Sequence, residues 1–553
     1  MLADWLQVWI RNDVRYLVNH GYDLGLAYAA ARVAWKHFND PDFKIAVHRD
    51  QWLAKAKQID EVRENAMYTD DTGQELIKYP YRIMPRRMWD LKSNRVVEFR
   101  MLHSEVLARE CLPGSVIISL DKPPLPSFWA ITHSWTNEMS PVNTSINQYQ
   151  WPTPLPRGLD LEHSVRRELL SKGAEYVWLD VLCLRYHSSM DDNTEWKVDA
   201  PTIGNIFRTA VWIAHYLNGL GQAFSSNGWD DSRHWLNRAW TLQEIRSENT
   251  TYNAGVLRKT SAHTIMNTEG RVDGKVTTLR QALEPIVRLA AQVDSESGCS
   301  VYELVQQMAK RYAAKPTDKV AGLFYLLRTT QLPTYDAGIS EGDAWARCFH
   351  VLPFERKVEI LFDFPYSGDS AGTGHDCQWF PTWRQLMEWP GRDPHLDHTR
   401  AVCPQNQGYL QAEKPGHLLM LDIWAISDVS LCQTDYGNTD ATDIWGQTFV
   451  IDIGDEIFGF YYPYVGQNPI KMSSSGRYTL VTTTHSDNSY NWVVCEPLGK
   501  RDESYTVPGG AVEVAEVEAL GKLGVLRTDS CSELVLGWGR GYSILNKINA
   551  LFI

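Results

Sequence analysis

The spacing of apolar residues changes several times along this chain, and each change predicts a different kind of structure. Residues 1–75 repeat apolar side chains at helical spacing, most clearly between positions 24 and 35. Residues 76–124 instead contain short apolar runs typical of strands, at 95–99 and 116–120. The pattern predicts a helical N-terminal region followed by a connecting segment of short strands.

Residues 125–255 alternate short apolar strands with helices. The strand candidates are 128–132, 176–183 and 211–217, and the helix candidates are 160–171, 201–210 and 235–244. This alternation predicts a parallel sheet covered by helices on both faces. Because ligands of such sheets bind at the carboxyl ends of the strands, Thr132, His133, Asp180 and the loop after Leu217 are expected to gather at one edge.

The remaining chain changes pattern once more. Residues 256–398 return to helical spacing, and residues 399–553 show short strands punctuated by Gly, Asn and Asp. The whole sequence therefore predicts an α/β protein with helical flanking segments and a C-terminal antiparallel β module.

Composition and charge indicate which kinds of molecule the protein is expected to bind. The 553 residues carry a net charge of -13 and no dense Lys/Arg run, which disfavours nucleic acid and anionic membranes. No apolar run reaches the length of a membrane-spanning helix, and the N-terminus lacks a basic region typical of secretory signals. The nine cysteines are scattered and no close His/Cys spacing appears, so neither disulfides nor a metal site is expected. We expect a cytoplasmic protein that binds a small molecule or another protein.

The segment 235–244, W-L-N-R-A-W-T-L-Q-E, is the richest in candidate chemistry. It places two indoles, a guanidinium, an amide and a carboxylate within ten residues that are predicted to form one helix. Trp240 and Glu244, four residues apart, would share a face of that helix. A helical Glu is usually solvated, but shielding by an indole would bury Glu244 in part and tune its carboxylate for chemistry.

Three other residues have simpler interpretations beside the functional one. Asp180 either caps the turn after its strand or lies at the ligand edge of the sheet. Glu195 is expected to be a solvated charge or a charge at a helix N-terminus. Cys183, within an apolar run, is expected to be a buried, inert thiol.

Four segments of the α/β region carry motifs in a fixed order. They are F-W-A-I-T-H-S-W-T at 128–136, W-L-D-V-L-C-L-R-Y at 178–186, Glu195 followed by 203–210, and the segment 235–244. They resemble the motifs of fungal heterokaryon-incompatibility (HET) domain proteins, and the fourth matches in full. Arg311 with the run from 317 to 320 resembles the segment that follows the domain in this family.

This resemblance implies a fold and a chemistry. HET domains are remotely similar to TIR domains, which have a flavodoxin-like parallel sheet, and many TIR domains cleave NAD⁺ with a glutamate in a W-x-x-x-E motif. Glu244 would then be the catalytic residue, holding the ribose hydroxyls and stabilising the developing ribosyl cation. NAD⁺ would be a substrate rather than a cofactor. Residues implied in substrate binding are Thr132, His133, Trp135, Asp180, Arg238, Trp240 and Gln243.

The chain also departs from the family. Thr132-His133 replaces the usual Ser-Tyr, Thr136 replaces a Gly, and Arg185-Tyr186 replaces Asn-Gln. The leading hypothesis is NAD⁺-hydrolase-like cleavage in fungal allorecognition or programmed cell death. Two alternatives stay open: a non-enzymatic signalling module that binds a protein or itself, and a specialised metabolic enzyme on the same scaffold.

Overall fold

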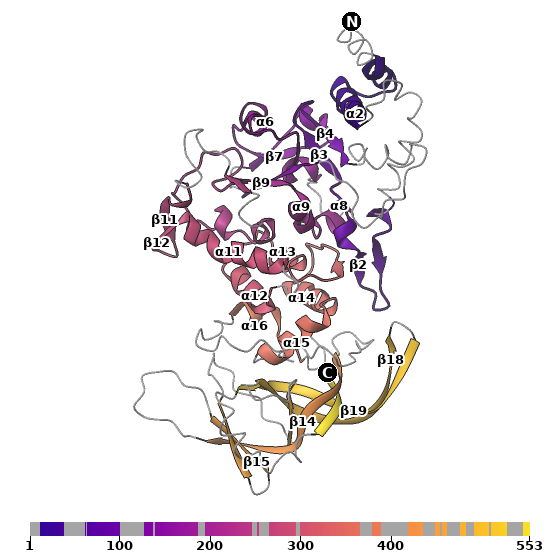
Figure 1. The fold of residues 1–553 in the computed structure, drawn as a ribbon, viewed down its shortest axis with the longest axis vertical. Coiled ribbons are helices and arrows are strands. Elements are labelled where there is room, and N and C mark those ends of the chain that lie inside the picture. The colour runs from indigo at the N-terminus through magenta and orange to yellow at the C-terminus, as the bar shows by residue number, and fades with distance from the viewer. Residues whose placement is uncertain are drawn as a thin grey trace. The chain divides into compact units, whose positions relative to one another are not determined.

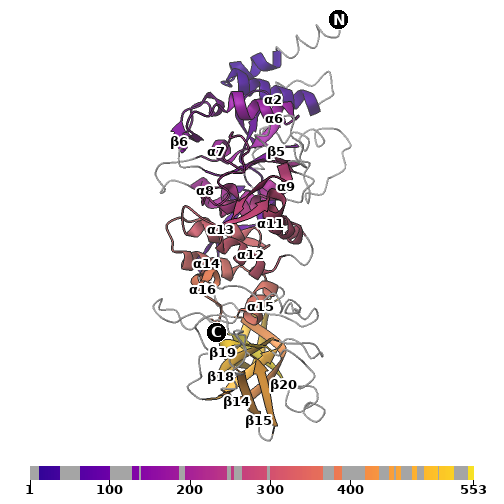
Figure 2. The ribbon, with the colours of Figure 1, turned by 90° about the vertical axis from the view of Figure 1, so that its left-hand side faces the viewer.

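The computed structural model describes the chain in two compact units. The described residues are 12–37, 61, 63–99, 127–135, 139–185, 194–245, 251–253, 265–294, 299–364, 379–388, 418–434, 448–453, 456–461, 476–482, 491–507, 510–527 and 546–552. The first unit comprises Met1–Gly298, Lys310–Leu326 and Thr330–Gly338, and the second comprises Cys299–Ala309, Leu327–Thr329 and Ile339–Ile553. Figures 1 and 2 show the elements of each unit.

The first unit is built on a six-stranded mixed sheet with strand order β10-β9-β5-β8-β3-β4. Four strands run parallel, namely β5 (Trp129–His133), β8 (Tyr176–Trp178), β9 (Trp212–Tyr216) and β10 (Thr251–Asn253). Within this parallel part Thr132 lies opposite His215, and Ala130 lies opposite Trp178. Residues 130–133 of β5 are buried, as expected for a parallel strand with helices on both faces.

The predicted parallel sheet is extended at one edge by antiparallel strands. β3 (Arg87–Asp90) and β4 (Arg95–Glu98) form a hairpin, and β3 pairs antiparallel with β8. Both strands come from the segment that the apolar pattern assigned to a connection. All four residues of β3 are buried, so this hairpin is part of the core of the first unit and not only a connection before it.

Helices cover both sides of this sheet (Figures 1 and 2). α6 (Arg167–Ser171), which continues a π-helical turn at Glu162–Arg166, lies on one side, and α8 (Thr194–Asp199) and α9 (Ile203–Thr209) lie on the other. An edge-on contact between the rings of Trp178 and Phe207, with centroids 5.6 Å apart, packs α9 against β8.

The predicted strand at 176–183 is in fact two elements. β8 ends at Trp178, and a single helical turn, α7 (Asp180–Cys183), begins at Asp180. The Asp180 carboxylate accepts the N–H of Val181 at 2.7 Å, which satisfies one of the free donors at the start of the turn. Asp180 thereby lies just beyond the carboxyl end of its strand.

The other elements of the first unit are short sheets and helices. A three-stranded sheet joins β1 (Met67–Thr69), β2 (Glu75–Lys78) and β13 (Gln331–Pro333). Two hairpins are formed by β6 (Met139–Val142) with β7 (Thr153–Pro156) and by β11 (Glu269–Val272) with β12 (Lys275–Thr278). The helices are α2 (Leu24–His37), α11 (Leu279–Asp294) and α13 (Thr317–Phe324).

The second unit combines helices with a large sheet. Its helices are α12 (Val301–Ala309), α14 (Glu341–His350), α15 (Phe354–Asp363) and α16 (Trp383–Glu388). Its seven strands are β14 (Leu418–Thr434), β15 (Thr448–Ile453), β16 (Glu456–Tyr461), β17 (Tyr478–Thr482), β18 (Asn491–Val507), β19 (Gly510–Arg527) and β20 (Asn546–Phe552). The pairings among these described strands are antiparallel, except that β19 and β20 run parallel. Within the part of the chain that the structure describes, no helix has the length and apolar character needed to cross a membrane.

Candidate functional site

A cavity of about 290 Å³ lies at the carboxyl ends of β5 and β8. Residues from α8, α9 and the segment 238–244 complete its walls, together with residues before and within α13. This is the edge at which parallel sheets usually bind ligands. All of the residues that line the cavity belong to the first unit.

The segment 235–244 is not the single helix that its spacing predicts. It forms two short 3₁₀ turns, Trp235–Asn237 and Trp240–Glu244, separated by Arg238 in an extended conformation (φ -89°, ψ 139°). The break is caused by a distant partner. Tyr312 donates its N–H to the Asn237 carbonyl at 2.6 Å and accepts the Ala239 N–H at 2.8 Å. These bonds hold Arg238 beside Tyr312 as a β-bridge and prevent a continuous helix.

A buried arginine stabilises the two turns. The Arg311 guanidinium donates to the Arg238 carbonyl at 2.6 Å and to the Thr241 hydroxyl oxygen at 2.9 Å. The Thr241 hydroxyl in turn donates to the Trp235 carbonyl at 2.7 Å. Burial lowers the pKa of Arg311 to about 10, and the nearby Glu244 carboxyl opposes that effect. Arg311 thus donates to the carbonyl at the break and to the hydroxyl oxygen that links the two turns.

Glu244 is 9% exposed, and two consecutive hydrogen bonds link its carboxyl group to the Trp235 indole. The Trp235 indole N–H donates to the Thr132 hydroxyl oxygen at 2.6 Å, and the Thr132 hydroxyl donates to Glu244 Oε2. Because an indole N–H can only donate, the single Thr132 proton is directed to Glu244. Burial raises the pKa of Glu244 to about 8, although the Thr132 hydrogen bond lowers it in part. Glu244 therefore holds a proton near neutral pH.

Asp180 has the opposite environment in the same cavity. Its Oδ1 lies 2.7 Å from His133 Nε2, and its Oδ2 accepts the Trp135 indole N–H at 2.9 Å. Burial alone would raise the pKa of Asp180, but these partners outweigh burial and lower it. Burial alone would likewise lower the pKa of His133, but Asp180 outweighs it and raises that pKa. Asp180 is therefore an ionised carboxylate.

Aromatic rings and cations form the rest of the cavity wall. The Tyr335 ring lies 6.0 Å from the Trp240 ring and 6.3 Å from the Trp196 ring, measured between centroids. The Tyr335 hydroxyl donates to Asp318 Oδ1 at 2.7 Å. Arg238 and Lys315 line the same cavity. The cavity thus presents three carboxyl groups, of which Asp318 is bonded to Tyr335, an aromatic wall and the cationic side chains of Arg238 and Lys315.

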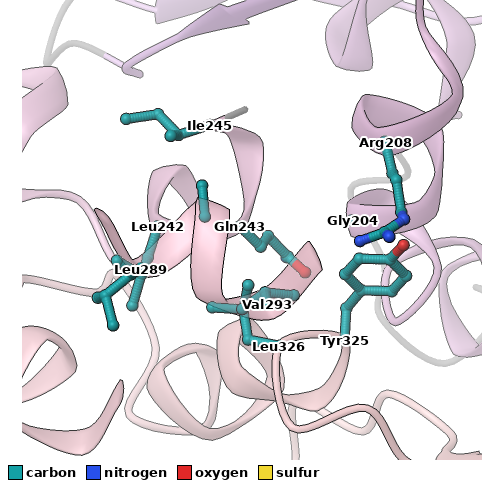
Figure 3. Close-up of a pocket in the computed structure, with 10 residues that line it drawn as sticks. Gly204, Arg208, Leu242, Gln243, Ile245, Leu289, Val293, Tyr325 and Leu326 are labelled. Carbon is teal, nitrogen blue, oxygen red and sulfur yellow. The ribbon is translucent and has the colours of Figure 1, made fainter. Parts of the chain in front are cut away.

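The structure brings together most of the residues expected from sequence. His133, Trp135, Asp180, Arg238, Trp240 and Glu244 line the cavity. Thr132 is fully buried behind Glu244 and does not line it. Gln243 faces a second, much smaller cavity of about 20 Å³ (Figure 3), toward Tyr325. Neither polar atom of the Gln243 side chain has a hydrogen-bond partner among the described residues.

Other contributors lie where motif spacing does not point. Lys315, Asp318 and Tyr335 enter the cavity from more than seventy residues beyond Glu244, because the chain returns to the first unit there. The sequence signal for this segment was its family-like run after Arg311. That run includes Asp318, without a role assigned to it, but neither Lys315 nor Tyr335.

The remaining expectations have mixed outcomes. Glu195 lies in the first turn of α8 but is not solvated, because it accepts two hydrogen bonds from the Arg87 guanidinium, at 2.7 and 2.9 Å. Burial would raise the pKa of Glu195, but Arg87 outweighs it and the pKa is lowered. Cys183 is fully buried, which confirms that part of the prediction, and burial raises its pKa to about 12, a value typical of an unreactive thiol. Among the described residues, no group of three His, Cys, Asp or Glu side chains is arranged to hold a metal ion. Thr136 and Tyr186 lie outside the described residues.

No protein-family model, curated protein or solved structure matches this chain. The chemistry available to the cavity is therefore derived from its own residues. Those residues include two carboxyl groups in one 290 Å³ space, Glu244 with a raised pKa and Asp180 with a lowered pKa.

Proposed function

We propose that this cavity binds a nucleotide, NAD⁺ or a related one, and cleaves its N-glycosidic bond. The observation that carries the proposal is the pair Glu244 and Asp180, two carboxyl groups whose environments move their pKa values in opposite directions. Cleavage of a glycosidic bond develops positive charge on the sugar, and paired carboxyl groups are the usual means of assisting it. Groups whose pKa values are pushed apart divide such work between them.

The other cavity residues fit the parts of a nucleotide. The rings of Trp240 and Tyr335 offer a surface on which a base stacks. Arg238 and Lys315 supply positive charge for a phosphate group, and a guanidinium can bind two phosphate oxygens at once. The ribose would then lie between these two regions, beside Glu244 and Asp180.

The arrangement of the sheet supports a finer proposal about the fold. In chain order the parallel strands are β5, β8, β9 and β10, and in space they run β8-β5-β9-β10. This is the 2-1-3-4 order of flavodoxin-like sheets. With the four ordered motifs it supports a HET domain related to TIR domains. The resemblance alone supports a cytoplasmic role in fungal allorecognition or programmed cell death.

The proposal is tested by incubating the purified full chain with NAD⁺ and with nucleoside monophosphates and following release of the free base. Glu244→Gln should lower the rate of base release from the monophosphates by at least about 100-fold, the usual contribution of a positioned acid or base. The matched control is Glu284→Gln, which removes an exposed carboxyl group from α11 and should leave the rate unchanged.

Two results would contradict the proposal. Equal rates for wild type and Glu244→Gln would show that Glu244 is not at the reacting centre. No base release by the wild type from any of these nucleotides would reject their N-glycosidic cleavage and favour the signalling alternative or another substrate.

A further inference from the structure

We infer that Glu244 donates a proton to the departing base, so that the cavity takes nucleoside monophosphates with uncharged bases in preference to NAD⁺. This inference rests on the proposed N-glycosidic cleavage and adds to it the class of substrate. It is carried by the geometry of the two carboxyl groups, whose oxygens have different partners.

Glu244 has one oxygen to offer a ligand. Thr132 occupies Oε2, and Glu244 forms no ion pair with any described residue. Three charged groups influence it: Asp180 and His133 at the strand ends, and Arg311, whose guanidinium donates to the Arg238 carbonyl and the Thr241 hydroxyl oxygen. A buried carboxylate without an ion pair is costly, so the neutral acid is favoured. With Oε2 accepting from Thr132, the acidic proton lies on Oε1.

Asp180 cannot play that part. Both of its oxygens already accept N–H groups, from His133 and Trp135, and those bonds favour the carboxylate form. Its side chain is nevertheless 24% exposed, so its negative charge reaches the cavity. Asp180 is therefore suited to stabilise positive charge on the ribose, while Glu244 supplies the proton.

This division of roles favours substrates whose leaving base needs a proton. When the bond between C1′ and the base nitrogen breaks, its electron pair goes to that nitrogen. An uncharged base would leave as an anion unless Glu244 protonates it, whereas the pyridinium of NAD⁺ becomes neutral nicotinamide without a proton. Water then adds to C1′ and returns one proton to the Glu244 carboxylate, which restores the acid. A proton donor at this position assists only the first kind of substrate.

The size and charge of the cavity agree with a small nucleotide. Its volume of about 290 Å³ lies at the lower end of the range for small-molecule sites, which favours a mononucleotide over a dinucleotide. Arg238 and Lys315 line it and suit a terminal phosphate, and Asp318 is engaged by the Tyr335 hydroxyl. These three groups are the other charges that face the cavity.

The first test uses the wild-type full chain with AMP, GMP, UMP and NAD⁺ across a range of pH. We expect kcat/KM for base release from the monophosphates to exceed that for nicotinamide release from NAD⁺ by at least about tenfold. For the monophosphates, kcat/KM should be constant at neutral pH. It should fall about tenfold per pH unit above the Glu244 pKa of about 8, because only the protonated acid is active. A rate that instead rises through this range would overturn the inference.

The second test separates proton donation from a structural role. 4-Nitrophenyl β-D-ribofuranoside has a leaving group that needs no proton. Glu244→Gln should lose at least about 100-fold on AMP but less than about tenfold on this substrate. Equal losses on both substrates, in a variant whose thermal unfolding temperature is at or above that of the wild type, would overturn the inference.

The outcomes for the two proposals are distinct. Cleavage of NAD⁺ without cleavage of the monophosphates would leave the proposed function standing and reject proton donation by Glu244. Cleavage of none of these substrates would reject the proposed function itself.

Discussion

The buried Thr132 hydroxyl forms a hydrogen bond with each of two groups, the Trp235 indole N–H and the Glu244 carboxyl. Thr132→Val keeps the shape but leaves a buried indole N–H and a buried carboxyl without their partner. We expect the free energy of unfolding to fall by about 1–3 kcal/mol, measured by urea denaturation. Because the Thr132 hydrogen bond lowers the pKa of Glu244, the alkaline limb of activity should also move to higher pH.

Thr132→Ser is the matched control for this change because it retains the hydroxyl. It should keep the pH profile of the wild type. A valine variant with wild-type stability and an unmoved alkaline limb would show that the hydrogen-bond chain has no energetic role.

Ionisation of Glu244 should lower the free energy of unfolding as the pH rises. Its folded pKa of about 8 lies above its usual value of 4.5, so between these pH values the folded state holds a proton that the unfolded state has lost. The free energy of unfolding therefore falls as pH rises through this window and levels off above it. Glu244→Gln removes this loss and should be more stable than wild type at pH 8, by an amount on the order of a few kcal/mol.

Urea denaturation of both proteins at pH 5 and pH 8 measures this difference. The stabilisation should be larger at the higher pH. A variant that is less stable than wild type at pH 8 would indicate that Glu244 is ionised in the folded protein.

At the scale of elements, the two turns of 235–244 depend on a residue far along the chain. Arg311 donates to the Arg238 carbonyl and to the Thr241 hydroxyl oxygen. Arg311→Gln should lower the free energy of unfolding by about 1–3 kcal/mol, since it leaves buried acceptors without their donor. It should also raise the pKa of Glu244, because the guanidinium lowers it. Arg280→Gln, on the exposed face of α11, should change stability by less than about 0.5 kcal/mol in the same urea titration.

The same element shows where prediction from sequence ends. The spacing of 235–244 suits a helix, and local propensity offers no reason for a break at Arg238. The break comes from pairing with Tyr312, and no local pattern contains that partner. β5 and β9 were placed to within a residue or two, because their burial on both faces leaves a continuous apolar run.

The site itself was predictable in part for the same reason. Residues at strand ends converge by topology, so Asp180 and His133 could be placed together from the sequence alone. The direction in which a side chain points depends on the backbone dihedral angles of its residue, which the sequence pattern does not give. Gln243 and Glu244 are neighbours in sequence, yet they face different cavities, because consecutive residues of any helical turn point in different directions.

At the scale of the whole molecule, the residues that line the cavity belong to the first of the two units, although they come from segments between 131 and 335. A bound nucleotide should therefore protect separate stretches of sequence at once. We expect AMP, bound to the unreactive Glu244→Gln variant, to slow amide hydrogen exchange in 128–135, 176–185, 235–245 and 311–318. The reason is mass action, since ligand present at about 100 times its Kd stabilises the folded site by about 2.7 kcal/mol.

Strands β17 and β18 of the second unit serve as internal controls and should exchange at unchanged rates. Protection confined to the second unit would place the nucleotide site elsewhere in the chain, whereas protection of the four stretches together would show that one ligand contacts the strand ends, the two 3₁₀ turns and α13.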